Sequence, residues 1–216
     1  MTGGLIALTF DDGPDPEITP QILDILEQNH VPASFFLIGN RITPETVPIL
    51  QRAVKLGCEM CNHSYSHPYL TVLSPKQIQH EVSAAAQRII QVTGQTPRFF
   101  RPPFLAVREE IFGIISVPFI GGYGVRDYDA NVSESERYSG IMQLAQDGRI
   151  LLLHDFADNT QTVGAVRRFV PDLLARGFRF VTVSQLFRMK GVTPISGAGI
   201  IYSHTGQTTM YAPDAT

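Results

Sequence analysis

Two adjacent carboxylates, Asp11 and Asp12, directly follow an apolar run at residues 5–10. Such a run is typical of a buried strand, so both acids would lie where the strand ends. Neighbouring side chains at a strand end diverge, which would let one acid bind a metal while the other moves a proton. An Asp-Gly turn without any chemical role would explain the same residues, because Gly13 and Pro14 follow.

Two histidines, His63 and His67, lie four residues apart after a second strand-like segment. Imidazoles at this spacing can converge on one cation in a helix or in a tight loop. With one carboxylate, they would form a ligand set that leaves coordination positions open for water and substrate. A histidine pair alone is often surface chemistry without a metal, but the acids at residues 11 and 12 favour a metal site.

The two cysteines, Cys58 and Cys61, form a Cys-x-x-Cys motif just before the histidine pair. Such a motif could bind a second metal or act in redox chemistry. On a strand, however, the two thiols would point to opposite sides and pack as small buried residues. A zinc site would need further partners at matching spacing, and His30, His80 and His204 are scattered. We therefore favour packing.

The composition indicates a single-domain protein and argues against a nucleic-acid-binding or membrane-spanning one. A chain of 216 residues with 44% hydrophobic residues can bury one sizeable core, so we expect one domain. A net charge of −3 without a basic stripe argues against a nucleic-acid partner, and the chain has no run of ~18 apolar residues that would span a membrane. Residues 1–4 lead almost directly into the first strand without an export signal. We expect a cytoplasmic protein, or a secreted or cell-surface one whose leader has been removed.

Short apolar segments alternate with helical patterns, as in βα units around a parallel sheet or barrel. Strands are expected at residues 5–10, 33–38, 58–62, 98–101, 118–121, 149–155 and 178–183. Helices are expected at residues 19–30, 43–57, 74–94, 107–115, 133–147, 161–176 and 184–190. The sequence therefore predicts an α/β fold with one domain at residues 1–191, followed by a C-terminal tail at residues 192–216 that is packed or loose.

Polar side chains follow four of the expected strands, namely the acids and histidines above, Arg101 and His154. In a βα barrel the carboxyl ends of the strands open on one face, so we expect these side chains to converge there. A histidine at the end of an apolar strand is also typical of a hydrogen-bonded core residue. Its place on the same face favours an acid or a base at His154.

These residues resemble the motifs of the polysaccharide deacetylases of carbohydrate esterase family 4, also called the NodB homology domain. The resemblance covers residues 4–190. Residues 9–14 (TFDDGP) resemble the first motif, 63–67 (HSYSH) the second, 101–104 (RPPF) the third and 152–154 (LLH) the fifth. The family implies a distorted (β/α) barrel of about seven parallel strands. It also implies removal of acetyl groups from sugars with a divalent cation, commonly zinc and sometimes cobalt or nickel.

The fourth motif departs from the family's pattern. The family usually has two aspartates and then Trp, whereas residues 124–128 (GVRDY) keep only the second aspartate, Asp127, and place Tyr128 after it. The preceding residues 119–122 (FIGG) resemble a subgroup that includes acetylxylan esterases. The two cysteines also occupy positions where the family commonly has His and Gly.

The resemblance implies that Asp12, His63 and His67 hold the cation. The cation would polarise the acetyl carbonyl and acidify a water molecule. Asp11 would take the proton of that water as the base, and Arg101 would fix the orientation of Asp11.

The resemblance also implies the groups that act on the acetyl oxygen and the leaving group. The backbone N–H of Phe104 would help to stabilise the oxyanion. His154 would protonate the leaving group, and Asp127 would hold its ring and raise its basicity. Tyr128 and Leu152 would line a small apolar pocket for the acetyl methyl group.

Three functions remain open at this point. The first, which we favour, is removal of N-acetyl groups from N-acetylglucosamine units of chitooligosaccharide or peptidoglycan. The second is an esterase that removes O-acetyl groups from acetylated xylan or xylooligosaccharides. The third, a non-catalytic carbohydrate-binding module, is disfavoured because the base, metal and acid positions are intact. In each case the partner is an acetylated oligosaccharide or polysaccharide.

Overall fold

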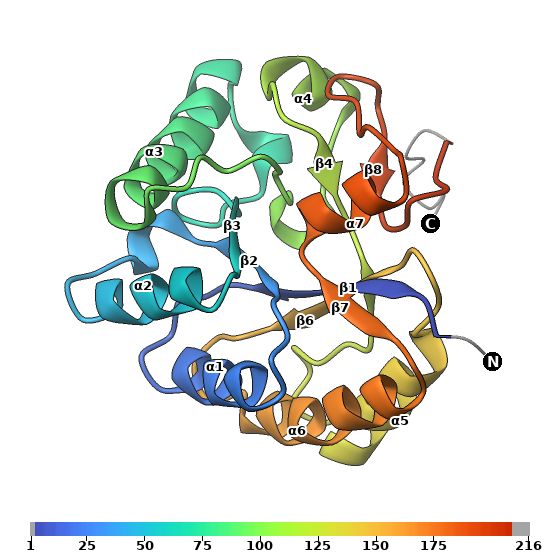
Figure 1. Cartoon of the computed structure of the whole chain (residues 1–216). Coiled ribbons are helices and arrows are strands. Elements are labelled where there is room, and N and C mark those ends of the chain that lie inside the picture. The colour runs from blue at the N-terminus through green and yellow to red at the C-terminus, as the bar shows by residue number, and fades with distance from the viewer. Residues whose placement is uncertain (1–2, 209–216) are drawn as a thin grey trace.

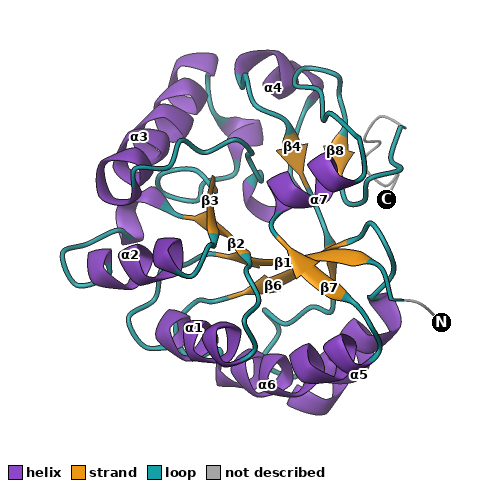
Figure 2. Cartoon of the chain, in the orientation of Figure 1, coloured by secondary structure: helices purple, strands orange, loops and turns teal. Residues whose placement is uncertain are grey.

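The strands run parallel at the centre of an α/β fold, and helices pack around them (Figure 1 and Figure 2). The computed structural model describes residues 3–208. Its strands are β1 (Leu5–Asp11), β2 (Ser34–Leu37), β3 (Glu59–Asn62), β4 (Phe119–Ile120), β5 (Tyr123–Gly124), β6 (Ile150–His154), β7 (Arg179–Val181) and β8 (Ile201–Tyr202). The helices are α1 (Ile18–Gln28), α2 (Val47–Lys55), α3 (Pro75–Thr93), α4 (Glu109–Ile114), α5 (Glu134–Leu144), α6 (Thr160–Ala175) and α7 (Val183–Met189), with short 3-10 turns η1 (Gly39–Arg41), η2 (Leu70–Val72) and η3 (Pro103–Leu105). The α/β fold with parallel strands is confirmed.

Local sequence signals set the ends of the helix α3. The Ser74 hydroxyl caps its first turn and Gln77 reaches back to the Ser74 backbone N–H, a reciprocal capping box. The helix ends at Gly94, whose φ of 71° lies in the left-handed region that glycine adopts without strain. The expected helix at residues 74–94 is confirmed.

Strand β1 lies at the centre of the sheet and pairs with β2, β6 and β7, while β3 pairs with β2. The strand expected at residues 98–101 is wrong, because only Phe100 forms bridges there, to Asn62 and to Phe119. Pro97 and Pro102 flank this segment and have no N–H to extend a ladder. The segment still links β3 to β4 through Phe100.

The C-terminal segment closes the ring of strands. Strand β8 pairs with β4, and the N–H of Gly121 donates to the carbonyl of Tyr202 at 3.0 Å. The N–H of Ile150, at the start of β6, donates to the carbonyl of Ser203 at 3.0 Å. Residues 201–203 thus connect β4 to β6 and complete a distorted barrel. The part of the expected tail at residues 209–216 lies outside the described residues.

Alternation along the strands decides which side chains enter the barrel. On β1, Ile6, Leu8 and Phe10 pack in the core cluster shared with the surrounding helices. Thr9 and Asp11 therefore point to the opposite, interior side. Leu152 and His154 of β6 alternate in the same way with Leu151 and Leu153, which pack in that cluster. No helix within the described residues is long and apolar enough to cross a membrane.

Candidate active site

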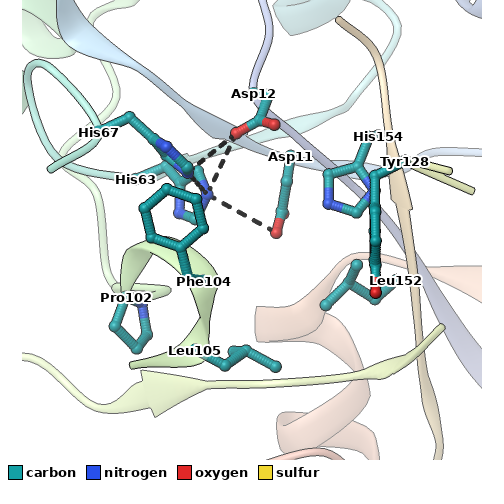
Figure 3. Close-up of a pocket in the computed structure, with 10 residues that line it drawn as sticks. All are labelled: Asp11, Asp12, His63, His67, Pro102, Phe104, Leu105, Tyr128, Leu152 and His154. Carbon is teal, nitrogen blue, oxygen red and sulfur yellow. Dashed lines mark hydrogen bonds and ion pairs between the residues drawn. The ribbon is translucent and has the colours of Figure 1, made fainter. Parts of the chain in front are cut away.

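A pocket of about 460 Å³ opens at the carboxyl ends of the strands (Figure 3). Its lining consists of Asp11, Asp12, His63, His67, Pro102, Phe104, Leu105, Tyr128, Leu152 and His154. Eight of these ten residues are candidates named from the sequence. The remaining two candidates, Arg101 and Asp127, lie behind the lining and contact Asp11 and His154.

Asp12, His63 and His67 bring one potential ligand atom each to a common point. Oδ1 of Asp12 lies 3.4 Å from Nε2 of His63 and 3.2 Å from Nε2 of His67, and the two Nε2 atoms lie 3.2 Å apart. Within residues 3–208, no other group of three or more His, Cys, Asp or Glu side chains converges closely enough to hold a metal ion.

The chemistry of these three atoms fits a divalent cation. The ring of His63 donates from Nδ1 to the Arg101 carbonyl at 2.7 Å, because a carbonyl can only accept, and this leaves Nε2 of a neutral ring unprotonated. Burial and the neighbouring His63 lower the pKa of His67 to about 4, so its ring is neutral near pH 7.

The carboxylate of Asp12 completes the ligand set. Burial would raise the pKa of Asp12, but the neighbouring His63 and His67 outweigh that effect and lower it to about 2. Oδ1 of Asp12 is buried and has no hydrogen-bond partner among the described residues. A buried, unsatisfied carboxylate oxygen is costly, and a cation held with two imidazole nitrogens would satisfy it.

Glu81 of α3 fastens the loop that contains both histidines. Its Oε2 accepts from the backbone N–H of Tyr65 at 2.9 Å and of Ser66 at 2.8 Å, and its Oε1 accepts from the Ser66 hydroxyl at 2.7 Å. Within this loop, Ser64 and His67 have φ values of 69° and 60°, a region that non-glycine residues rarely adopt. Glu81 was not expected as a site residue, because an acid on a helix face has no distinctive spacing.

Asp11 is buried beside the potential ligands and pairs with the guanidinium of Arg101. Arg101 is itself fully buried and donates to the Thr9 hydroxyl at 3.0 Å and to the carbonyls of residues 120–121. Because these acceptors fix the guanidinium, it fixes the Asp11 carboxylate in turn. Oδ2 of Asp11 lies 3.8 Å from Nε2 of His63.

His154 lies across the pocket from the two histidines (Figure 3). Asp127, behind the lining, holds the ring of His154. Its Nδ1 lies 2.8 Å from Oδ1 of Asp127, and its backbone N–H donates to Oδ2 at 2.8 Å. The Thr162 hydroxyl of α6 also donates to Oδ2, at 2.9 Å. Burial would lower the pKa of His154, but the hydrogen bond and charge of Asp127, with the charge of Asp11, raise it to about 9. The protonated ring therefore carries a proton on Nε2 as well as on Nδ1.

The three expected substrate-contacting residues all line the pocket. Leu152 is nearly buried, whereas Tyr128 is exposed and meets the His154 ring edge-on at 5.7 Å. The N–H of Phe104 makes no backbone hydrogen bond within the described residues. Leu105 also lines the pocket and was not expected, although it directly follows the third motif.

The cysteines pack on opposite sides of β3, as expected. Cys58 lies in the core cluster that faces the helices, and Cys61 lies in a second cluster with Phe36 and Phe99 inside the barrel. Burial raises the pKa of both thiols. Neither belongs to the group of converging ligand atoms.

The fold and the pocket define a class of protein: a parallel-strand barrel with a pocket whose residues fit a metal ion. The chain belongs to the polysaccharide deacetylase family, because residues 1–116 match the sequence profile of that family. This family is metal-dependent. Relatives in it are named deacetylases and esterases, so the chain is an enzyme that acts on acetylated carbohydrate. The resemblance to carbohydrate esterase family 4 is confirmed.

The chain is similar to two named relatives in sequence and to one solved structure in fold. The chain is 45% identical over 190 residues to a bifunctional xylanase/deacetylase of Pseudobutyrivibrio xylanivorans, covering 88% of the chain and 31% of that protein. It is 35% identical over 193 residues to a peptidoglycan-N-acetylglucosamine deacetylase of Bacillus cereus, covering 86% of the chain and 89% of that protein. It superimposes with a TM-score of 0.90 and 36% identity on a family 4 acetyl xylan esterase from Clostridium thermocellum in complex with a cobalt ion, covering 94% of this chain and 100% of that one.

Proposed function

We propose that the chain hydrolyses acetyl groups on polysaccharide with Asp11 as the base, His154 as the acid, and Asp12, His63 and His67 as metal ligands. One observation supports this assignment above the others. Figure 3 shows Asp11 between the potential ligand atoms on one side and the His154 ring on the other. An acetyl group bound beside Asp11 would therefore have the metal site on one side and the acid on the other.

A divalent cation at this ligand set would polarise the acetyl carbonyl and lower the pKa of a water molecule. The carboxylate of Asp11 would take a proton from the attacking water. The buried guanidinium of Arg101 would keep this carboxylate in a fixed orientation during the transfer. Pre-positioning of this kind removes much of the entropic cost of the step.

The N–H of Phe104, which makes no backbone hydrogen bond among the described residues, would donate to the acetyl oxygen that becomes negative in the tetrahedral intermediate. Nε2 of His154 would then give its proton to the departing oxygen or nitrogen. Leu152 and Tyr128 would contact the acetyl methyl group. Zinc is the first metal to test, because it is bound well by imidazole nitrogens with one carboxylate, and cobalt and nickel are alternatives.

O-acetyl groups of xylan are the first substrate to test. The xylanase/deacetylase of Pseudobutyrivibrio and the acetyl xylan esterase of Clostridium thermocellum, named above, support this choice. N-acetylglucosamine units, the substrate favoured from the sequence, become the second candidate, and the Bacillus cereus relative supports them.

Acetate release from acetylated xylooligosaccharide and from chitopentaose, measured side by side with the zinc-loaded protein, tests the proposal. Faster release from the xylooligosaccharide is expected, and the opposite order would move the assignment to N-acetyl groups. No release from either substrate, or equal release after the metal is removed with a chelator, would contradict the proposed function.

A further inference from the structure

An exposed pair of stacked aromatic rings lies beside the pocket. The rings of Tyr69 and Phe104 have centroids 4.0 Å apart and planes only 14° apart, and each residue is 53% exposed. The Phe104 ring also meets the ring of His67 edge-on at 4.5 Å. A continuous run of three rings therefore leads from the pocket to the surface, beginning at the potential metal ligand His67.

The backbone at Phe104, one member of this pair, has a strained conformation. Phe104 and Leu105 both have positive φ values, 59° and 53°, which bulky residues seldom adopt. Strained residues of this kind persist where the surroundings enforce them, and they cluster at binding sites. Next to Tyr69, Leu70 is fully buried and anchors the η2 turn, so the exposed ring does not belong to a loose loop.

We propose that Tyr69, together with Phe104, binds the sugar unit adjacent to the one whose acetyl group lies in the pocket. The C–H-rich face of a pyranose ring packs well on an aromatic face, and a neutral sugar offers no charge for an ion pair. Phe104 contacts both regions, because it lines the pocket and stacks on Tyr69. This inference rests on the proposed function, since it takes an acetylated sugar chain as the substrate.

The opposite wall of the pocket also has an exposed aromatic residue, Tyr128, which is 61% exposed. Figure 3 shows Phe104 and Tyr128 on opposite sides of Asp11. A sugar chain could thus cross the pocket and contact an aromatic residue on each side. The protein should bind oligosaccharides more tightly than single acetylated sugars.

The test compares Tyr69→Ala with Tyr69→Phe, which keeps the ring, and with Val72→Ala, which trims an exposed apolar side chain in the same turn without touching the pair. Binding of unacetylated xylotetraose and chitotetraose is measured by calorimetry, and KM and kcat are measured on acetylated xylotetraose and on an aryl acetate. Tyr69→Ala should weaken binding of at least one tetrasaccharide and raise KM on acetylated xylotetraose by about 3- to 10-fold. The rise in KM should be smaller on the aryl acetate than on acetylated xylotetraose. Tyr69→Phe should retain most of the wild-type tetrasaccharide binding and KM.

Unchanged tetrasaccharide binding in Tyr69→Ala would overturn the inference. Equal losses on every substrate, or a loss of the same size in Val72→Ala, would also overturn it, because they would indicate a structural role. The calorimetry separates this inference from the proposed function. Tyr69-dependent binding without any acetate release would refute the function alone, and acetate release with Tyr69-independent binding would refute the subsite alone.

Discussion

Asp11 and His154 are direct register partners on the adjacent parallel strands β1 and β6. The backbone pairing of two buried strands therefore sets the separation between the proposed base and the proposed acid. Parallel pairing also puts both residues at the carboxyl end of the sheet, where their side chains enter the same pocket. The two groups need no mobile loop to meet the substrate.

The charge of Asp127 should control the pH dependence of the acid. The pKa of His154 is raised to about 9 largely through Asp127, so the acid form persists until the pH rises through that value. Asp127→Asn removes the charge and should move the alkaline limb of the kcat profile to lower pH, by roughly 1 to 3 units. An unmoved limb, at unchanged metal content, would show that His154 is not the acid.

Removal of either histidine of the ligand set should empty the metal site. His63→Ala and His67→Ala should each weaken zinc binding by at least ~100-fold, because the three protein ligands leave no substitute. Metal analysis after dialysis gives the stoichiometry directly. The double variant Cys58→Ser, Cys61→Ser is the matched control and should retain one zinc, since both thiols pack away from the group. Stoichiometric zinc in both histidine variants would refute the ligand set.

Asp11→Asn should separate metal binding from turnover. The amide keeps the shape of the side chain but cannot take a proton, so kcat should fall by ~10² to 10⁴. Zinc content should be unchanged, because Asp11 is not one of the proposed ligands. Wild-type turnover at full zinc occupancy would assign the base role to another group.

Asp155 should make the metal-free protein less stable as the pH rises. Burial, together with the charges of Asp12 and Asp11, raises its pKa to about 7, although the Thr19 hydroxyl donates to it at 2.6 Å and opposes the shift. The folded state thus holds a proton that the unfolded state releases near pH 4, and stability falls between these two values. Thermal unfolding from pH 4.5 to 8 should show a smaller decline in Asp155→Asn than in the wild type. Parallel curves would contradict this assignment.

The C-terminal segment should be required for stability and activity. A chain that ends at Gly191 lacks β8, and with it the hydrogen bonds to Gly121 and Ile150 that close the barrel. The carbonyl of Gly121 is also one of the acceptors that fix Arg101. We expect Tm to fall by ~5 °C or more and kcat to fall with it. A chain that ends at Thr208 keeps every described contact and is the control; equal Tm values for the two chains would refute this role.

Most residues of the pocket could be predicted from the sequence, because its polar side chains come directly after apolar, strand-like segments. Asp11, His63 and His154 each come where a buried strand ends, and parallel topology brings such positions together. Glu81 and Thr162 could not be found this way, because they are polar residues on helix faces whose partners lie far away in the sequence.

Two strands were predicted incorrectly: the one expected at residues 98–101 is absent, and β8 was not expected. Residues 98–101 have the composition of a strand, but prolines on both sides reduce the pairing to Phe100. Strand β8 has only two residues within a segment rich in Gly and Thr, so no periodic pattern could form. Its pairing with β4 depends on contacts across about a third of the chain, which local sequence does not encode.

Arg101 serves the two halves of the pocket through different parts of one residue. Its guanidinium holds Asp11, and its carbonyl oxygen accepts the hydrogen bond from Nδ1 of His63. The proposed base and a proposed metal ligand are thus positioned by the same residue. A shift of residue 101 would therefore displace both groups together.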